Sequence, residues 1–220
     1  MAAHDTRERP MRRDAVRNQR LVIEAARDVV SEFGTDASME LIASRAGVGV
    51  GTVYRRFPNK EALVDEIVGL MLSELVVEAR RALTLDDGTG LEVFLRVLGH
   101  SLSTHRGYAV KAVGRSKADC VEQLRDLIDE LLGQAQRHGR IGPDIRLGDV
   151  MAVAWAVRGI VETTGSVAPD AWQRHLDIHL AGLRAAAPQS ARVPVSREQL
   201  TLITGVAHPD RAPGERPAVR

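Results

Sequence analysis

The amino-acid sequence predicts an all-α fold, and three observations carry this prediction. Apolar residues recur at helical spacing in successive segments, beginning with Val22, Ala25, Ala26 and Val29. Aromatic residues make up only 3% of the 220 residues, whereas β-sheets are usually rich in them. No segment has a convincing strand pattern, and we therefore expect helices throughout.

The predicted helices follow one another with short connections. The first spans residues 12–33, and Gly34 ends it as a C-cap would. Ser38 and Asn59 are the expected N-caps of the second and the fourth helix. The later helices are expected at about 38–46, 50–57, 60–85, 91–104, 108–115, 119–138, 147–164 and 170–186.

Composition divides the chain into four segments. Residues 1–11 are polar and charged and are expected to form a flexible basic arm. Residues 12–59 contain three helices, and residues 60–186 contain the longer helices of a second domain. Residues 187–220 are rich in proline and are expected to lack regular structure beyond a short helix at 197–204, which Ser196 and Gln199 would begin as a capping box.

Positive charge gathers near the N-terminus, although the whole chain has a formal net charge of only +1. The first 60 residues contain 11 Lys and Arg against 8 Asp and Glu. Residues 7–20 alone contain six arginines. This excess is a modest electrostatic footprint for a polyanion, and a solvated tail explains the arm equally well.

The sequence gives no positive support to catalysis, a metal site or membrane insertion. No nucleophile–base pair, phosphate loop or acid pair stands at a recognisable spacing, so we expect no enzyme and no cofactor. His175 and His179 are spaced as metal ligands can be, but no third ligand is evident, and interface histidines are the preferred interpretation. The single cysteine, Cys120, excludes an intrachain disulfide. We expect a cytoplasmic protein, because no apolar run reaches the roughly 18 residues of a membrane span.

The strongest motif is a helix-turn-helix at about residues 38–57. Its first helix needs a small residue where the two helices cross, and Ala43 supplies it. Its turn needs a residue that tolerates left-handed backbone, and Gly47 stands four residues later. Its second helix must bury an apolar residue, and Val53 stands six residues after Gly47. The miniature core is completed by Met39, Ile42, Ala46, Val48 and Phe57.

The outward residues of the second helix are suited to double-stranded DNA. Glycines near its start let the backbone approach DNA, and Thr52 can meet a base edge or a thymine methyl group. Tyr54, Arg56 and Lys60 offer a hydroxyl or a positive charge to phosphate oxygens. The predicted DNA contacts are Arg12, Arg13, Ser38, Gly49, Val50, Gly51, Thr52, Tyr54, Arg55, Arg56 and Lys60. A helical hairpin buried in a core is the alternative, which exposed arginines and the basic arm disfavour.

The segment 12–66 closely resembles the TetR family of transcriptional regulators. The resemblance rests on Ser38-Met39, Ile42-Ala43, Ala46-Gly47-Val48, Gly51-Thr52-Val53-Tyr54, Phe57 and Lys60-Glu61-Ala62-Leu63. Two positions depart from the family pattern. Gly49 stands where Ser or Thr is common, which removes a hydroxyl contact, and Arg56 stands where His is frequent but keeps a donor.

The resemblance implies a homodimer that binds palindromic operator DNA through an N-terminal three-helix domain. It also implies a helical domain for effector binding and dimerisation. A lipophilic or aromatic effector is expected, and the predicted pocket residues are Met71, Phe94, Leu98, Tyr108, Leu124, Leu127 and Trp155. Core packing explains the three aromatic residues of that set equally well. The predicted interface residues are Ala152, Ala156, Gly159, Trp172, His175, His179 and Leu183.

The resulting prediction is a repressor that a small-molecule effector releases from its operator, although the sign of regulation stays open between repressor and activator. One alternative is a constitutive DNA-binding protein without an effector, which would have a filled C-terminal core. Another is a helical small-molecule-binding or enzymatic protein with a vestigial helix-turn-helix, which would bind no DNA.

Overall fold

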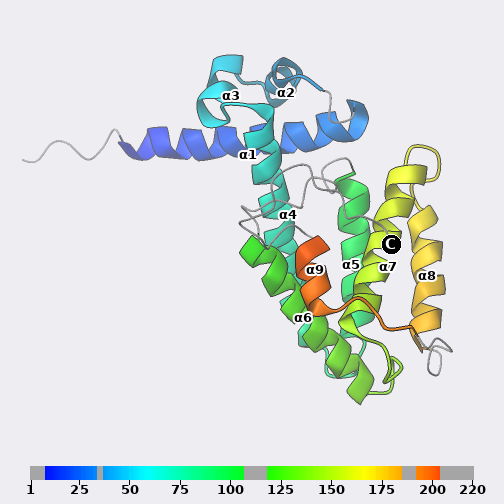
Figure 1. The fold of residues 1–220 in the computed structure, drawn as a ribbon. Coiled ribbons are helices and arrows are strands. Elements are labelled where there is room, and N and C mark those ends of the chain that lie inside the picture. Colours follow the sequence, from blue (N-terminus) through cyan, green and yellow to red (C-terminus); the bar gives the residue numbers. More distant parts are fainter. Residues whose placement is uncertain (1–7, 34–36, 107–117, 185–191, 204–220) are drawn as a thin grey trace, which may run out of the picture.

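The computed structural model confirms the all-α prediction and describes residues 8–33, 37–106, 118–184 and 192–203, which contain no strand. In chain order the helices are α1 (Glu8–Phe33), α2 (Met39–Ala46), α3 (Val50–Arg56), α4 (Lys60–Leu83), α5 (Gly90–Thr104), α6 (Ala118–Arg137), α7 (Leu147–Thr164), α8 (Ala171–Arg184) and α9 (Arg197–Ile203). Figure 1 shows α1 lying across α4, with α2 and α3 on one side of it and the other helices on the opposite side.

Most predicted helices agree with the observed ones to within about three residues, with two exceptions. α1 begins at Glu8, so residues 8–11 are helical, whereas we expected them in a flexible arm. The rest of that arm lies outside the described residues, as do the side chains of Arg12 and Arg13. The helix expected at 108–115 also lies outside the described residues.

The first three helices pack around a small apolar core. The side chains of Val22, Ala26 and Val29 from α1, Ile42 from α2 and Val53 from α3 are all at most 2% exposed. α1 packs mainly against α2, and α3 closes the group against both. This core sets the orientation of α3, which is too short to be stable by itself.

The body of the molecule is built on α4, which leads from α3 into a bundle with α5, α6, α7 and α8 (Figure 1). α4 packs against α5 and α6, and α8 packs against α5 and α7. Gly99 of α5 permits a close contact with α8, because a Cβ there would lie 2.2 Å from Cζ3 of Trp172. Within the described ranges, no helix is long and apolar enough to cross a membrane.

A short helix, α9, lies where the capping box predicted one. The Ser196 amide donates to Oε1 of Gln199 at 2.9 Å, and the Gln199 amide donates to Oγ of Ser196 at 3.2 Å. Leu200 of α9 is fully buried. The segment that precedes α9 lies close to α7, because a Cβ on Gly148 would stand 2.1 Å from the Val195 carbonyl oxygen. Residues 192–196 have no regular structure, and α9 packs onto the bundle through Leu200. The rest of the proline-rich tail lies outside the described residues.

Candidate nucleic-acid interface and internal cavity

The turn between α2 and α3 has the backbone geometry that the sequence predicts. Ser38 caps α2, since its Oγ accepts a hydrogen bond from the Leu41 amide at 3.2 Å. Gly47 ends α2 with a φ of 66°, in the left-handed region that favours glycine. Its amide and that of Val48 donate to carbonyl oxygens of α2. The chain thus reverses within three residues and enters α3.

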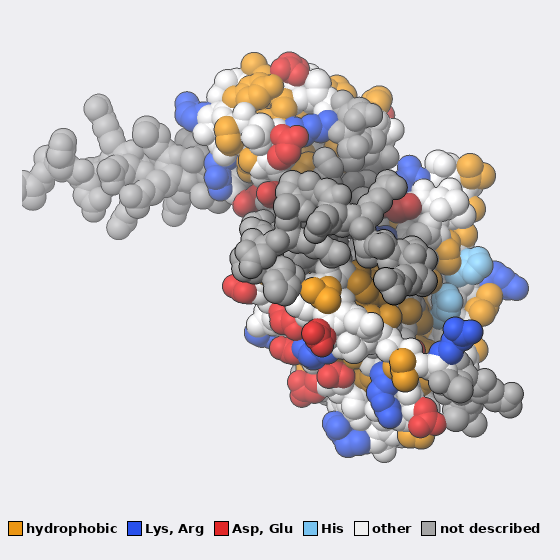
Figure 2. Space-filling view, viewed as in Figure 1, with side chains coloured by type: hydrophobic (Ala, Val, Ile, Leu, Met, Phe, Trp, Pro, Cys, Tyr) orange, Lys and Arg blue, Asp and Glu red, His pale blue; other side chains and the backbone are white. Residues whose placement is uncertain are grey.

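α3 is held from one side and exposed on the other. Val53 is fully buried and Phe57, which follows the helix, is 2% exposed. By contrast, Tyr54, Arg55 and Arg56 are exposed, together with Gly49, Val50 and Gly51 at the start of the helix, while Thr52 is half-buried. In Figure 2, the surface over α2 and α3 carries apolar side chains with basic and acidic ones among them. The arrangement matches the predicted outward set on α3.

The two glycines at the start of α3 are not required by packing within the chain. A Cβ on Gly51 would have no heavy atom within 4 Å, and one on Gly49 would meet only Oγ1 of Thr52 at 4.0 Å. Both residues lie on exposed backbone with φ outside the positive region. Their missing side chains therefore leave a free path to the backbone from outside the molecule.

Two predicted phosphate-binding residues have partners within the chain. The Tyr54 hydroxyl donates to Oε1 of Glu40 at 3.3 Å, and desolvation followed by the Glu40 carboxylate raises the pKa of Tyr54. Nε of Arg56 donates to Oε1 of Gln19 at 3.2 Å, and its guanidinium lies 5.3 Å from the centre of the Phe57 ring. These contacts orient both side chains on the exposed surface. Gln19 and Glu40 were not in the predicted set, because their contacts join segments that are distant in sequence.

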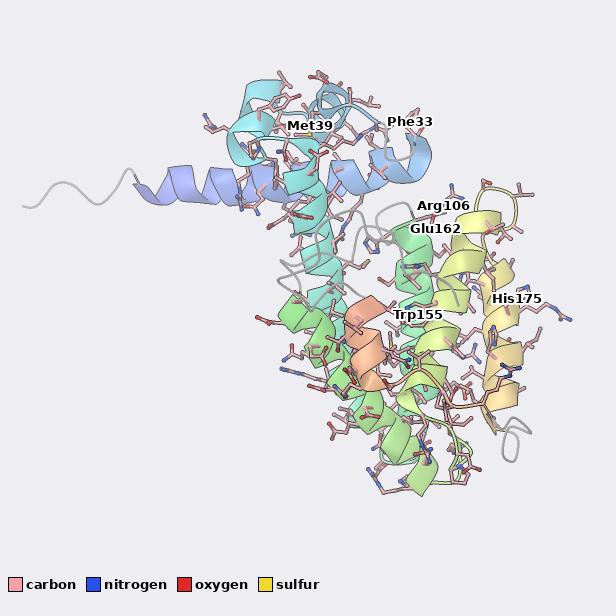
Figure 3. The ribbon with its side chains drawn as sticks, in the orientation of Figure 1. Phe33, Met39, Arg106, Trp155, Glu162 and His175 are labelled. Carbon is pink, nitrogen blue, oxygen red and sulfur yellow. The ribbon has the colours of Figure 1, made fainter. Side chains whose placement is uncertain are left out.

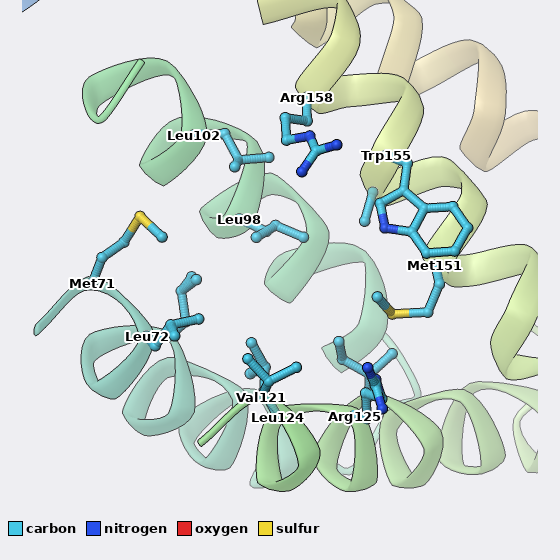
Figure 4. A pocket seen from close by; sticks show the side chains of 13 residues that line it. Met71, Leu72, Leu98, Leu102, Val121, Leu124, Arg125, Met151, Trp155 and Arg158 are labelled. Carbon is cyan, nitrogen blue, oxygen red and sulfur yellow. The ribbon is translucent and has the colours of Figure 1, made fainter. Parts of the chain in front are cut away.

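A mainly apolar cavity of about 140 Å³ lies within the helical body. It is lined by residues of α4, α5, α6 and α7, as Figure 4 shows. Of the predicted pocket residues, Met71, Leu98, Leu124 and Trp155 line this cavity. Phe94 does not, because it is fully buried in the core, and Leu127 packs against the core outside the cavity wall. Tyr108 lies outside the described residues.

The sequence interpretation missed several cavity residues, of which Met151 and Arg158 are the most informative. Both share a helix face with Trp155, at four residues before and three residues after it. That spacing was a usable signal for both positions. Arg158 was missed because an arginine in an apolar helix is usually assigned to the solvent side.

The predicted interface residues differ in exposure and fall into three groups. Ala152, Gly159 and His175 are exposed, and Figure 3 places His175 on the outer side of α8. Ala156 and His179 are half-buried. Trp172 and Leu183, by contrast, are only 5% and 7% exposed. This corrects the expectation that they face a partner, because they belong to the face of α8 that packs into the body of the same chain.

Comparisons with known proteins agree with this architecture. Residues 22–67 match the bacterial regulatory proteins of the tetR family, and residues 86–185 match the C-terminal domain of SbtR-like transcriptional regulators. An HTH-type transcriptional regulator of Bacillus subtilis, YhgD, is 40% identical over 70 residues, which are 31% of this chain and 37% of that protein. The chain thus spans well under half the length of that curated relative.

Solved structures extend the similarity over both parts of the molecule. A TetR regulatory protein from Mycobacterium vanbaalenii is 30% identical, with a TM-score of 0.59, over 80% of this chain and 100% of that one. A TetR regulator from Streptomyces coelicolor is 31% identical, with a TM-score of 0.58, over 78% of this chain and 99% of that one. With its helix-turn-helix, its helical body and these matches, the chain belongs to the TetR family of bacterial transcriptional regulators.

Proposed function

We propose that this protein is a sequence-specific DNA-binding repressor that a small apolar effector releases from its operator. The observation that carries the proposal is the exposed face of α3, which is held in place by Val53 and leaves Gly51, Thr52 and Arg55 open to a partner. A short helix presented in this way fits the major groove of B-DNA. Family membership supports regulation of transcription over catalysis.

The repressor would act as a two-fold symmetric dimer on a palindromic operator. A dimer places two recognition helices in successive major grooves about one helical turn apart. The exposed face of α7 and α8 supports this assembly, since it combines small residues, Ala152 and Gly159, with Ile178, which is 54% exposed. A Cβ on Gly159 would meet no heavy atom within 4 Å, so a second helix has room to approach.

The cavity supports an effector site. It lies in the bundle whose helix α4 continues directly from the helix-turn-helix, so a ligand that changes the packing of α4 can change the position of α3. A constitutive binder would need no such cavity, and the cavity therefore favours the effector-controlled regulator over that alternative.

Selection of bound sequences from random double-stranded DNA tests the proposal. The wild-type chain should enrich an inverted repeat whose half-sites lie one helical turn apart. A variant carrying Thr52→Ala and Arg55→Ala should keep its helical content, because neither side chain is buried, but should lose this enrichment. If the wild-type chain enriches no sequence, the proposal fails and the vestigial helix-turn-helix becomes the better interpretation.

A further inference from the structure

The internal cavity combines apolar walls with an excess of positive charge. Aliphatic side chains such as Leu72, Leu98 and Leu124 form most of its surface. Two arginines, Arg125 and Arg158, also line it, and its described lining residues include no carboxylate. A site of this composition suits a ligand that is apolar over most of its surface and negatively charged at one end.

Arg125 already has its charge paired and both of its terminal nitrogens hydrogen-bonded within the chain. It is 1% exposed, and its guanidinium donates to the Glu122 carboxylate one turn earlier on α6. It also donates to Oγ1 of Thr201 at 3.3 Å and to the Leu200 carbonyl oxygen at 3.1 Å. Arg125 therefore joins α6 to α9 and has little capacity left for a ligand.

Arg158 is different, because it has no hydrogen bond or ion pair with any residue that the structure describes. It is half-buried on α7, one turn after Trp155, and both side chains line the cavity. Figure 4 shows its guanidinium extending from α7 into the region between Leu102 and Trp155. The Arg158 guanidinium is thus available to bind a ligand at the end of the cavity near Leu102 and Trp155.

A guanidinium in this position favours an anionic ligand over a neutral one. Partial burial beside apolar walls removes water from Arg158, and a charge without a partner there is unfavourable. A carboxylate can accept two parallel N–H···O bonds from one guanidinium, and such charge-assisted bonds are stronger than those between neutral groups. An alcohol of the same shape has one uncharged oxygen and accepts only the weaker hydrogen bonds of a neutral group.

The size of the cavity limits the apolar part of the ligand. Its volume of about 140 Å³ is close to that of a dry protein cavity of roughly 150 Å³ that accepts benzene. A ring or a chain of about six carbons therefore fits. We propose, building on the effector role proposed above, that the ligand is a small amphipathic carboxylic acid, an arylalkanoate or a medium-chain alkanoate, whose carboxylate binds Arg158.

Matched acids and alcohols test this assignment on the full-length chain without DNA. The probes are 3-phenylpropanoate with 3-phenylpropan-1-ol, and hexanoate with 1-hexanol, titrated by calorimetry and by tryptophan fluorescence. Each acid should bind at least about tenfold more tightly than its alcohol. Arg158→Gln should reduce the acid to the affinity of the alcohol without changing the alcohol, and Arg158→Lys should keep part of the preference. Arg80→Gln, on the exposed side of α4, is the matched control and should change neither affinity.

Three results would overturn the carboxylate site: equal affinities of acid and alcohol, an unchanged acid affinity in Arg158→Gln, or no binding of either probe. Because the titrations contain no DNA, they are independent of the proposed regulatory function. Release of DNA by the alcohols as effectively as by the acids would keep the effector role and overturn the carboxylate site. Binding of the acids through Arg158 without any change in operator affinity would keep the carboxylate site and overturn the effector role.

Discussion

At the scale of single residues, a side chain added at Gly51 should have opposite effects on the stability of the fold and on DNA affinity. Gly51→Ala should stabilise the protein by about 0.5–1 kcal/mol, because alanine favours a helix and the added methyl group has free space. The same methyl group should weaken operator binding about tenfold, because it holds the backbone of α3 away from the bases. Urea unfolding and a DNA titration measure the two effects.

Gly133→Ala on α6 is the control for this prediction, since its Cβ would meet only the flexible end of Arg137 at 3.4 Å. It should raise stability and leave operator affinity unchanged. Unchanged DNA affinity in Gly51→Ala would show that the backbone of α3 does not approach the DNA closely.

A second residue-scale prediction concerns His105, which ends α5 and is 6% exposed. Desolvation is the largest cause that lowers the pKa of His105 below the ordinary value of 6.5, and the charges of Arg27 and, least of all, His100 lower it further. The Ser101 carbonyl oxygen and the charge of Glu74 raise this pKa but do not offset the decrease. The unfolded chain therefore binds the proton more readily. The free energy of unfolding should be unaffected by this group above pH 6.5 and should decrease as the pH falls below 6.5.

Urea unfolding between pH 5 and pH 8 measures this dependence. One proton contributes at most about 1.4 kcal/mol per pH unit. His105→Leu should flatten the curve below pH 6.5, whereas His100→Gln, on the exposed side of the same helix, should leave its slope largely intact. Parallel curves for wild type and His105→Leu would exclude His105 as the source.

At the scale of secondary-structure elements, α9 has two kinds of attachment that should differ in strength. Arg197 contacts Glu122, Asp126 and Asp129 of α6 at 3.1, 2.8 and 3.4 Å. These pairs are largely solvated, so Arg197→Ala should cost about 1 kcal/mol or less, and high salt should reduce the cost. Leu200→Ala removes a fully buried side chain and should cost about 2–4 kcal/mol at any salt concentration.

Urea unfolding at low and at high salt distinguishes the two variants. If both variants lose the same free energy of unfolding and respond in the same way to salt, the contrast between a solvated ionic contact and a buried apolar contact is wrong. α9 is also tied to the cavity wall through Arg125, so loss of α9 should change the cavity as well as the stability.

At the scale of the whole molecule, DNA affinity should depend on assembly. Gly159→Glu should convert the dimer into monomers, because a charged side chain would occupy the exposed face of α7 that we assign to the partner. The monomer should bind the inverted repeat much more weakly, since it engages one half-site at a time. Light scattering at micromolar concentration and a DNA titration check the two statements.

Val77→Glu is the control for the dimer prediction, because Val77 is 56% exposed on α4. It adds the same charge away from α7 and α8 and should leave both assembly and operator affinity unchanged. A wild-type protein that is monomeric at micromolar concentration would rule out this dimer.

The sequence was most informative where a feature is local in the chain. Ser38, Gly47 and Val53 act within about fifteen residues of one another, through a cap, a left-handed turn and a buried contact, and the structure has all three. The capping box at Ser196 is equally local and likewise forms. The helices themselves follow from apolar periodicity, which needs no knowledge of neighbouring elements.

Tertiary structure alone decided what each apolar face packs against. Periodicity shows that α8 has an apolar face, but only the bundle directs Trp172 onto Gly99 and leaves Ile178 exposed. In the same way, the sequence could not distinguish a core position from a cavity wall at Phe94. In the structure Phe94 is fully buried in the core, whereas Leu98, one turn later, lines the cavity.

By itself, the sequence determined most of the described helices, the caps at Ser38, Gly47 and Asn59, and the helix-turn-helix. The local spacing on α7 shows only that Arg158 shares a helix face with Trp155. That this face encloses a cavity depends on contacts between helices that are distant in the chain, and no local pattern encodes those contacts.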